Sequence, residues 1–398
     1  MNFNALLKVE VQDFIEANNL SKVSTLALKK NPFADIEYAT ILNQIENRQK
    51  SKIKLPTWYS TKNIIYPAKV SIEQTSSEIT AQYKSKIIAG ESLIDLTGGF
   101  GVDDFYFAKS FQKVVHCDLN TELSAIVAHN FKQLHTKNIQ CIAGESLMIL
   151  NNLSQKFSWI YLDPSRRNDF KVKVFLLNDC LPNVPKLLLE YLRFTDNILL
   201  KTAPILDIKA GITELIHVKK IHIVAVENEV KELLWEIEKN YAGSIEIVTV
   251  NFTKIIVDTF NFIIDDLAIC SNYSLPQQYL YEPNSAIMKS GGFNEIGLQF
   301  NLNKLHQHSH LYTSATLQAF PGRIFKVEKS IYYCKKEMKI HFENTKKNIT
   351  IRNFPETVET IRKKWNIKEG GDDYCFFTTD RNNNKIVLIC KKINAAIS

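Results

Sequence analysis

The apolar positions of the first 85 residues recur with the spacing of a helix. In segments 5–17 and 36–49, apolar residues stand three or four positions apart, with Asn and Pro at the borders. A third helical pattern runs from Ser76 to Ile87 and leads straight into the next apolar run. Residues 1–85 are therefore predicted to form an N-terminal helical domain.

Strands and helices alternate from residue 90 to about residue 254. Short apolar runs predict seven strands, at 92–96, 113–118, 139–142, 157–162, 196–201, 219–226 and 245–251. Helical patterns separate them, the clearest at 121–135, and a last helix–strand unit at 227–251 closes the sheet. This alternation predicts an α/β fold whose mostly parallel sheet is covered by helices. Ligands of such folds bind at the carboxyl ends of the strands.

After about residue 277 the strands become short, and Lys, Asn and Tyr become frequent. His306, His308 and His310 alternate, and on a strand three imidazoles would share one face, as in a metal cluster. No cysteine or acid stands at ligand spacing beside them, and their neighbours are polar. A solvated loop is therefore favoured, and no metal site is predicted.

Composition places the chain among ordinary folded proteins. Of its 398 residues, 45% are hydrophobic and 23% are charged, and the length fits two or three domains. No apolar run approaches the roughly 20 residues that cross a bilayer, and the N-terminus lacks a secretory pattern, so no membrane partner is expected. Seven cysteines are scattered without a C-x-x-C pair, which favours reduced thiols and a cytoplasmic location.

The net charge of +7 is concentrated in the last third of the chain. Residues 271–398 hold 19 Lys and Arg against 11 Asp and Glu, whereas the rest holds 30 and 31. A cationic helix is expected at 358–365. This pattern fits contacts with the phosphates of a polyanion, without sequence reading. Solvated surface lysines are the alternative.

The stretch LIDLTGGFGVDD, residues 93–104, has the pattern of a strand, a glycine-rich turn and a helix start. Small residues after a strand-end acid let the backbone approach a ligand closely. A dinucleotide fingerprint would need a glycine where Asp104 stands. The pattern is more typical of S-adenosylmethionine (SAM) sites, and an ordinary tight turn is the alternative.

Charged residues follow three further predicted strands. Asp118 stands where a carboxylate reaches the ribose hydroxyls of an adenosine cofactor, and Glu145 stands where one could accept from an adenine amino group. Either acid could instead cap the helix that follows it. Lys201, after the fifth strand, could touch phosphate or cap the strand.

The sharpest chemical signal is YLDPSRR, residues 161–167, after the fourth predicted strand. Asp163 followed by Pro164 at the end of a buried strand has its carboxylate and carbonyl rigidly placed. Directed at an exocyclic amine, these acceptors would leave the nitrogen lone pair pointing at a methyl donor. The two arginines offer forked donors for phosphate. A plain turn with solvated arginines is the alternative.

Together these residues resemble class I SAM-dependent methyltransferases. The resemblance is carried by Asp95, Thr97, Gly99, Gly101, Asp118 and Asp163-Pro164. It is closest to the branch that acts on RNA guanine exocyclic amines, which includes trimethylguanosine synthases. The whole chain also resembles a bacterial family typical of Bacteroidetes, with the landmarks SIEQTSSEITAQYK, DLTGGFGVD, YLDPSRR, VENEVKELL, YLYEPNSAIMKSGG and RNFPETVETIRKKWNIKEGGDDYCFF.

The resemblance implies a Rossmann-like methyltransferase core at 86–275, with a mostly parallel seven-stranded sheet, after the helical domain at 1–85. An α+β region follows, with a ferredoxin-like piece at 276–320 and a THUMP-like domain at 321–398. THUMP domains bind RNA in tRNA-modifying enzymes. The implied activity is SAM-dependent methylation of a base nitrogen, an exocyclic amine, in a structured RNA (tRNA or rRNA). No DNA partner is expected.

The resemblance also assigns roles to single residues. Those expected to hold SAM are Asp95, Thr97, Gly98, Gly99, Gly101, Asp118 and Glu145. Asp163 and Pro164 would orient the acceptor nitrogen. Those expected to contact substrate or RNA are Ser165, Arg166, Arg167, Lys201, Arg352, Arg362, Lys363 and Lys364.

The chain departs from the usual amine-methyltransferase pattern after Asp163-Pro164. A proline and an aromatic residue are common there, but Ser165 and Arg166 occupy these places. Base stacking would then come from Tyr83, Tyr161 or Arg166. No cysteine follows the fourth strand, which argues against a covalent pyrimidine-C5 mechanism. Two other functions stay open: methylation of a protein or small molecule, and a non-catalytic RNA-binding scaffold.

Overall fold

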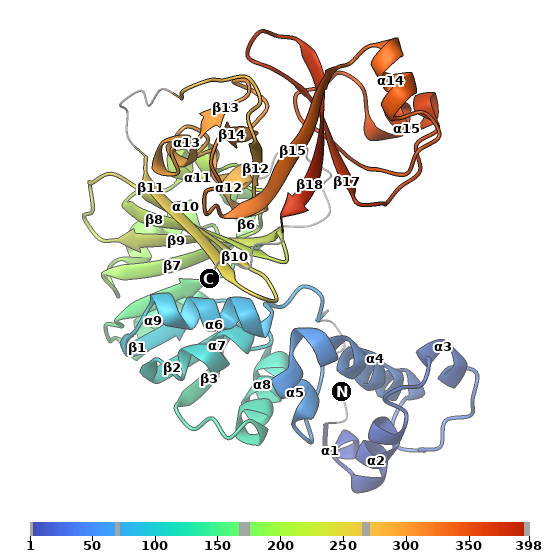
Figure 1. Ribbon diagram of the computed structural model, residues 1–398. Coiled ribbons are helices and arrows are strands. Elements are labelled where there is room, and N and C mark those ends of the chain that lie inside the picture. The colour runs from blue at the N-terminus through green and yellow to red at the C-terminus, as the bar shows by residue number, and fades with distance from the viewer. Residues whose placement is uncertain (1–2, 68–71, 167–175, 265–270, 394–398) are drawn as a thin grey trace. The chain divides into compact units, whose positions relative to one another are not determined.

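The fold was analysed in a computed structural model (Figure 1). It describes residues 3–67, 72–166, 176–264 and 271–393. The chain forms two compact units. Unit 1 comprises residues 1–218 and 235–241, and unit 2 comprises residues 219–234 and 242–398.

Unit 1 begins with helices. They are α1 (Phe3–Leu6), α2 (Val9–Ala17), α3 (Val23–Leu26), α4 (Tyr38–Lys54), α5 (Pro56–Ser60) and α6 (Glu78–Ile87). Pro56 stands in the first turn of α5, where its missing N–H leaves no bond unmade. The Ser77 side chain caps α6 by accepting a hydrogen bond from the Thr80 amide. The helical prediction for this region is confirmed.

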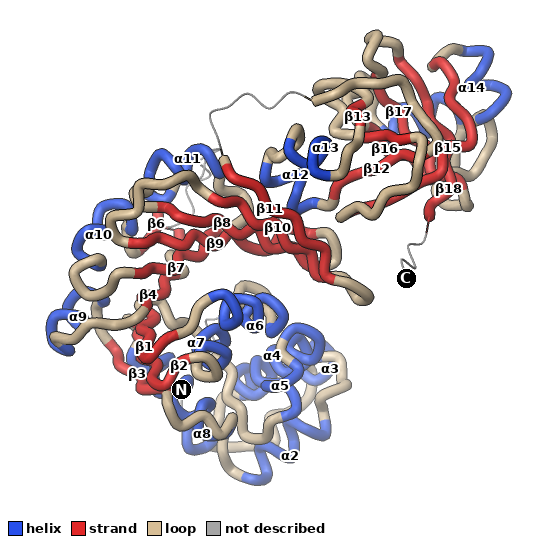
Figure 2. Tube along the Cα trace, turned by 60° about the vertical axis from the view of Figure 1, so that its left-hand side comes forward, coloured by secondary structure: helices blue, strands red, loops and turns tan. Residues whose placement is uncertain are grey.

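A parallel sheet lies at the centre of unit 1 (Figure 2). Its strands follow the order β7-β4-β1-β2-β3, with bounds β1 (Gly90–Asp95), β2 (Phe111–Asp118), β3 (Ile139–Ala143), β4 (Trp159–Leu162) and β7 (Asn197–Thr202). The pairing sets Asp95 of β1 beside His116 of β2 and Tyr161 of β4. The functional residues of these strands therefore meet at one edge of the sheet.

Helices connect the parallel strands. They are α7 (Val102–Phe107), α8 (Thr121–Gln133), α9 (Ser146–Leu153), α10 (Val184–Tyr191) and α11 (Ile208–Glu214). A small two-stranded sheet pairs β5 (Ser165–Arg166) with β6 (Cys180–Leu181), which follows the 3₁₀ turn η1 (Leu177–Asp179). The first five predicted strands and the helix predicted at 121–135 are all present.

The sheet has more strands than the seven expected. Its full order is β11-β10-β8-β9-β7-β4-β1-β2-β3. The remaining strands are β8 (Val218–Val226), β9 (Glu229–Glu238), β10 (Glu246–Phe252) and β11 (Val257–Ile263), and the two units divide β9 between them.

The helix expected after residue 227 is wrong, because the chain makes a tight turn there and returns as β9. Glu227 and Asn228 have φ of 49° and 62°, the left-handed conformation that a two-residue hairpin turn requires. The Asn228 amide donates to Asn251 Oδ1 at 2.9 Å. No glycine marks this turn in the sequence, and the apolar run that follows also fits helical spacing.

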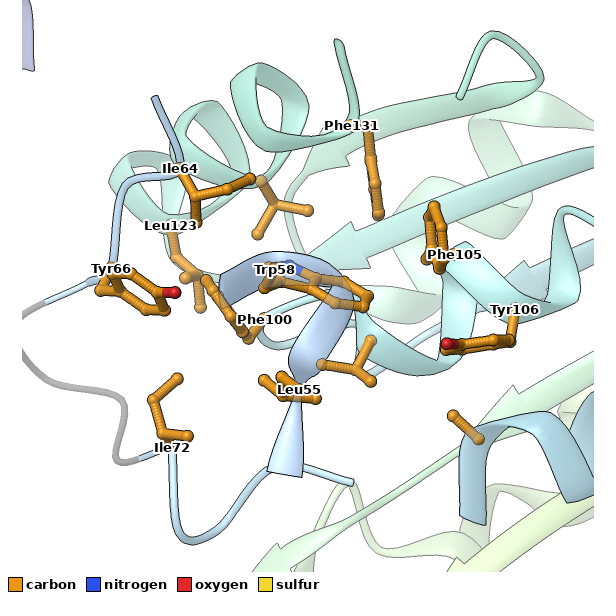
Figure 3. Packing of buried hydrophobic residues seen from close by; sticks show 13 residues of the cluster. Leu55, Trp58, Ile64, Tyr66, Ile72, Phe100, Phe105, Tyr106, Leu123 and Phe131 are labelled. Atoms are coloured by element: carbon orange, nitrogen blue, oxygen red, sulfur yellow. The ribbon is translucent and has the colours of Figure 1, made fainter. Parts of the chain in front are cut away.

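Aromatic packing joins the N-terminal helices to the glycine-rich turn (Figure 3). The Trp58 ring of α5 lies 6.4 Å from Phe100 and 5.0 Å from Phe105, measured between ring centroids. Tyr66 stacks on Phe100 at 5.8 Å. All four side chains are buried. Since Phe100 belongs to the turn itself, this cluster fixes one side of the turn.

Unit 2 contains a second sheet, of order β13-β14-β12-β15-β18-β17-β16. The strands are β12 (Tyr279–Pro283), β13 (Asn303–Lys304), β14 (Tyr312–Ser314), β15 (Gly322–Tyr332), β16 (Asn348–Ile351), β17 (Asp373–Thr379) and β18 (Lys385–Ile393). All pair antiparallel except β16 with β17. The helices are α12 (Ser285–Ser290), α13 (Glu295–Gln299), α14 (Lys335–His341) and α15 (Val358–Trp365). The helix predicted at 358–365 is confirmed.

The three alternating histidines lie in a loop, as predicted, but the loop is solvated only in part: His308 is exposed, His310 is half-buried and His306 is buried. His306 is buried, with Asn383 Oδ1 3.1 Å from its Nε2 and Asn353 Nδ2 2.9 Å from its Nδ1. His310 stacks on Phe293 at 3.6 Å. Distant asparagines and an aromatic ring supply these partners, so sequence neighbours could not indicate them. Within the described ranges, no group of His, Cys, Asp or Glu side chains is arranged to hold a metal ion.

We expect Trp58→Ala to lower the free energy of unfolding of unit 1 by about 3–5 kcal/mol, because it removes a buried ring and leaves a cavity beside Phe100. Denaturant titration followed by circular dichroism measures the change. Leu20→Ala, at a side chain that is 86% exposed, is the control and should stay within about 0.5 kcal/mol of wild type. An equally small effect for Trp58→Ala would contradict the packing.

Candidate functional site

Two carboxylates organise the glycine-rich turn after β1. Asp95 Oδ1 accepts from the Thr97 amide at 2.7 Å and from its hydroxyl at 3.1 Å. Asp118, at the end of β2, accepts from the Gly99 amide at 3.1 Å through Oδ2. Gly99 and Gly101 have φ of +54° and +76°, which side chains disfavour. The turn therefore holds a conformation that depends on glycine at both points.

The imidazole of His116 lies directly under Gly98. A Cβ atom on Gly98 would stand 2.1 Å from His116 Nδ1, so only glycine lets the turn rest on the ring. The same nitrogen lies 2.6 Å from Asp104 Oδ2, and both side chains are completely buried. The turn is thus supported from below by a buried hydrogen-bonded pair.

Burial controls the protonation of this supporting layer. It raises the pKa of Asp95 well above its usual value, and the nearby Asp104 adds to the rise. It likewise raises the pKa of Asp104, with Asp103 adding to the rise, and it lowers the pKa of His116. Burial therefore disfavours the charged form of both Asp104 and His116.

A pocket of about 240 Å³ opens beside the turn. Several residues predicted for the site line it: Asp95, Thr97, Gly98, Gly99, Gly101, Asp163 and Ser165. The segment before α6, residues 74–76, lines it too. A larger hollow of about 440 Å³ beside Phe131 and Cys141 contains none of the predicted residues. The smaller pocket is therefore the candidate site.

Asp163 stands in the pocket wall at the end of β4. Its amide donates to Thr97 Oγ1 at 2.6 Å, and its Oδ2 accepts from Lys201 Nζ at 2.6 Å. Lys201 Nζ also donates to Ser76 Oγ at 3.2 Å. The Asp163 side chain is 37% exposed and that of Lys201 only 12%. The carboxylate, rather than the ammonium group, is therefore available to a ligand.

A second ion pair lies deeper. Lys84 Nζ is 3.2 Å from Asp103 Oδ1, and Asp103 Oδ2 accepts from Ser76 Oγ at 2.9 Å and from the Tyr161 hydroxyl at 2.7 Å. Burial alone would raise the pKa of Asp103, but the charges of Lys84 and Lys201 outweigh it and lower the pKa. Asp103 is therefore ionised although it is buried.

Nearly the whole chain is similar to known proteins or domains. Residues 279–321 match a ferredoxin-like domain model, and residues 322–392 match a THUMP domain-like model. The crystal structure of a "putative methyltransferase from Porphyromonas gingivalis W83" is similar over 97% of this chain and 98% of its own, with 28% sequence identity and a TM-score of 0.86. No curated protein matches the sequence.

The fold is a methyltransferase-type core, followed in the chain by ferredoxin-like and THUMP-like domains. The predicted resemblance and the predicted fold class are thereby confirmed, except for the number of strands. The boundaries of the four predicted domains stay predictions.

Two further solved structures are weakly similar to part of the chain. TrmK of M. capricolum, in complex with S-adenosyl-homocysteine (SAH), has 14% identity and a TM-score of 0.30, covering 44% of this chain and 70% of its own. An rRNA methylase of Streptococcus thermophilus has 13% identity and a TM-score of 0.30, covering 40% and 94%. At TM-scores of 0.30, these two similarities do not bear on the function of this chain. In the part of the chain that the structure describes, no helix is both long and apolar enough to cross a membrane.

Glu145 lies outside the residues that line the pocket of this methyltransferase-type core. Its carboxylate caps α9, accepting from the amides of Leu147 at 3.1 Å and Met148 at 2.9 Å. Burial would raise the pKa of Glu145, but the hydrogen bonds from these amides lower it. The helix-cap alternative thus describes its contacts, and a contact with adenine stays a prediction.

Of the remaining predicted residues, Pro164 and Lys201 belong to unit 1 and are not among those that line the pocket, and Arg352, Arg362, Lys363 and Lys364 belong to unit 2. Arg167 and the side chain of Arg166 lie outside the described residues, and Pro164 follows Asp163 directly. Tyr161 lines the pocket, but its ring is buried and its hydroxyl donates to Asp103, so its stacking role stays a prediction. Lys201 is held by Asp163 and Ser76, so its side chain is engaged within the core.

In unit 2, the predicted Arg352 makes an internal ion pair. Its Nη2 lies 2.9 Å from Glu282 Oε1, and Arg323 binds the other oxygen of the same buried carboxylate. The predicted cations of α15 differ in exposure. Arg362 is half-buried, and Lys363 and Lys364 are exposed. Lys364 also contacts Glu356 and Tyr333.

Sequence reasoning missed the supporting residues Ser76, Lys84, Asp103, Asp104 and His116. The signal for two of them was present, because acids at 103 and 104 interrupt an otherwise apolar stretch after the glycines. Ser76 was noticed only as part of a helix start. Lys84 and His116 carried no signal, since their burial depends on segments far away in the chain.

We expect Gly98→Ala to lower the free energy of unfolding by about 3 kcal/mol, because the added methyl group would overlap the fixed His116 ring. Gly291→Ala is the control: its φ is +76° but nothing lies near the added carbon, so only backbone strain of about 1 kcal/mol is expected. Chemical denaturation compares the two. Equal losses would show that the ring does not limit the turn.

Proposed function

We propose that this chain is a SAM-dependent methyltransferase that methylates a base nitrogen, an exocyclic amine, in a structured RNA such as tRNA or rRNA. The observation that carries the proposal is Asp163, whose carboxylate stands in the wall of the pocket beside the glycine-rich turn. The similarity of nearly the whole chain to a methyltransferase structure supports it.

The residues of the turn fit SAM as cofactor. Gly99 carries no side chain into the pocket, and among the described residues a Cβ there would have only the Thr97 carbonyl oxygen within 4 Å, at 3.8 Å. This leaves room for a ligand against the backbone. Asp118 uses one oxygen for Gly99 and one for Asn120, and each oxygen keeps acceptor capacity for a ribose hydroxyl. Bound SAM would supply a sulfonium methyl group, reactive enough that alignment of the acceptor does much of the catalysis.

Asp163 would align the acceptor. An ionised carboxylate only accepts hydrogen bonds, so it would bind the N–H groups of an exocyclic amine and leave the nitrogen lone pair free. The hydrogen bond from the Asp163 amide to Thr97 Oγ1 ties the Asp163 backbone to the glycine-rich turn. One short hydrogen bond therefore sets the distance between Asp163 and the glycine-rich turn.

The THUMP-like domain would hold the RNA. Its exposed lysines include Lys335 and Lys336 on α14 and Lys363 on α15. Such cations bind phosphates without reading bases and make affinity depend steeply on salt. Arg352 contributes less freely, because Glu282 already neutralises it.

Titration calorimetry of the full-length protein with SAM and with SAH tests the cofactor. Micromolar binding is expected, and a radiolabelled-methyl assay against total tRNA and total rRNA then tests the substrate. Transfer to a protein extract with none to either RNA would favour the protein or small-molecule alternative. Binding of RNA with neither cofactor binding nor transfer would favour the scaffold alternative.

Asp163→Asn should reduce kcat for methyl transfer about 100-fold while SAH affinity stays near wild type, because the substitution weakens alignment of the acceptor and changes no residue expected to hold SAM. Calorimetry and the methyl-transfer assay separate the two effects. A parallel loss of SAH affinity would instead place Asp163 in the cofactor site.

Lys335→Glu, Lys336→Glu and Lys363→Glu combined should weaken RNA affinity and flatten its dependence on salt, with SAH affinity unchanged. Filter binding with total tRNA at several salt concentrations measures both. The matched control replaces Lys22, Lys29 and Lys30 with Glu. These lysines are also exposed, and their substitution changes the net charge by the same amount. An equal effect of the control set would show that only overall charge matters.

A further inference from the structure

Two lysines and two carboxylates form one connected network at the candidate site. Lys201 binds Asp163 at 2.6 Å, and Lys84 lies 3.2 Å from Asp103. Ser76 joins the two pairs: its Oγ donates to Asp103 Oδ2 at 2.9 Å and accepts from both lysines at 3.2 Å. The charges balance, with two of each sign.

The network draws its members from four separate elements. Lys84 belongs to α6, Asp103 to α7 and Lys201 to β7, while Asp163 follows β4. Lys84 has no exposed side-chain surface, and Asp103 has 10%. Charges so far from water must be paired, because removing one partner leaves the other uncompensated. The geometry of all four elements is therefore coupled.

Asp163 is the most exposed member of the network. Asp163 has more than three times the exposed fraction of Lys201, 37% against 12%, and lies in the pocket wall. Oδ2 of its carboxylate is bound by Lys201, which restricts side-chain rotation and leaves Oδ1 for another partner. The lysine is anchored in turn by Ser76, from the segment that lines the same pocket.

We propose that Lys201 is a positioning residue, which holds the Asp163 carboxylate turned toward the acceptor nitrogen, and that Ser76 fixes this pair to the buried Lys84–Asp103 pair. The inference rests on the proposed function of Asp163. It replaces the expected role of Lys201 as a phosphate contact. Through Ser76, the acceptor side of the pocket and the helix after the glycine-rich turn form one rigid body.

The alternative role for Lys201 is purely structural, as a cation that balances buried charge. The two roles differ in what a substitution changes. A structural cation would affect stability and cofactor binding together. A positioning residue would affect turnover more than KM or cofactor affinity, and arginine would restore part of the activity because it keeps the charge.

The experiment compares full-length wild type, Lys201→Met, Lys201→Arg and Ser76→Ala in methyl transfer to total tRNA and rRNA, with SAH affinity by calorimetry. Lys201→Met should lose about 100-fold in kcat, with KM and SAH affinity within about threefold of wild type. Lys201→Arg should remain within about tenfold of wild type, and Ser76→Ala should fall between the two. Lys113→Met, at an exposed position of β2, is the matched control.

A double-mutant cycle followed by thermal denaturation tests the ion pair without measuring activity. The melting temperatures of wild type, Lys201→Met, Asp163→Asn and the double variant should be non-additive, with the double variant losing less than the two single losses together. Additive losses would overturn the inference and leave the proposed function standing. Wild-type turnover in Lys201→Met would also overturn it, as would equal losses in kcat and SAH affinity. If the wild-type protein transferred no methyl group to any RNA, the proposed function would be refuted, and the positioning role of Lys201 would be refuted as well.

Discussion

Desolvated charge beneath the pocket constrains the whole of unit 1. Lys84 and Asp103 have almost no contact with water, and such charges cost several kcal/mol unless a partner of opposite sign and further hydrogen bonds accompany them. The partners come from α6, α7, β4 and β7, so none of these elements can shift without leaving a buried charge unpaired. The requirement to pair buried charge thus fixes the site on which the proposed chemistry rests.

The glycine-rich turn is held from two further sides. Beneath Gly98, the buried pair of His116 and Asp104 supports the backbone. Beside it, the aromatic cluster of Trp58, Tyr66 and Phe100 ties the turn to the N-terminal helices. The N-terminal region is therefore part of the scaffold of the site. Its packing against the turn explains how a loop rich in glycine keeps one conformation.

Unit 2 combines its two matched domains in one sheet. The strands of the ferredoxin-like match and those of the THUMP-like match meet where β12 pairs with β15, so the two share a hydrogen-bonded boundary. Glu282 of β12 strengthens the boundary by binding Arg323 and Arg352. These arginines serve the fold, whereas lysines of α14 and α15 such as Lys335, Lys336 and Lys363 are exposed.

The sequence by itself determined what depends on neighbouring residues: the helical N-terminal region, the parallel strands, the cationic helix and the acid–glycine turn at Asp95. Periodicity and turn chemistry act over a few positions, so one chain carries that information. It did not determine β9, whose turn at Glu227 and Asn228 lacks a glycine, or the environment of His306. Nor did it show that Lys201 binds Asp163, or that Lys84 and Asp103 are buried together. Only the tertiary structure decided these points, because the free energy of a charged side chain depends on the partners and the water around it, and these come from segments distant in the sequence.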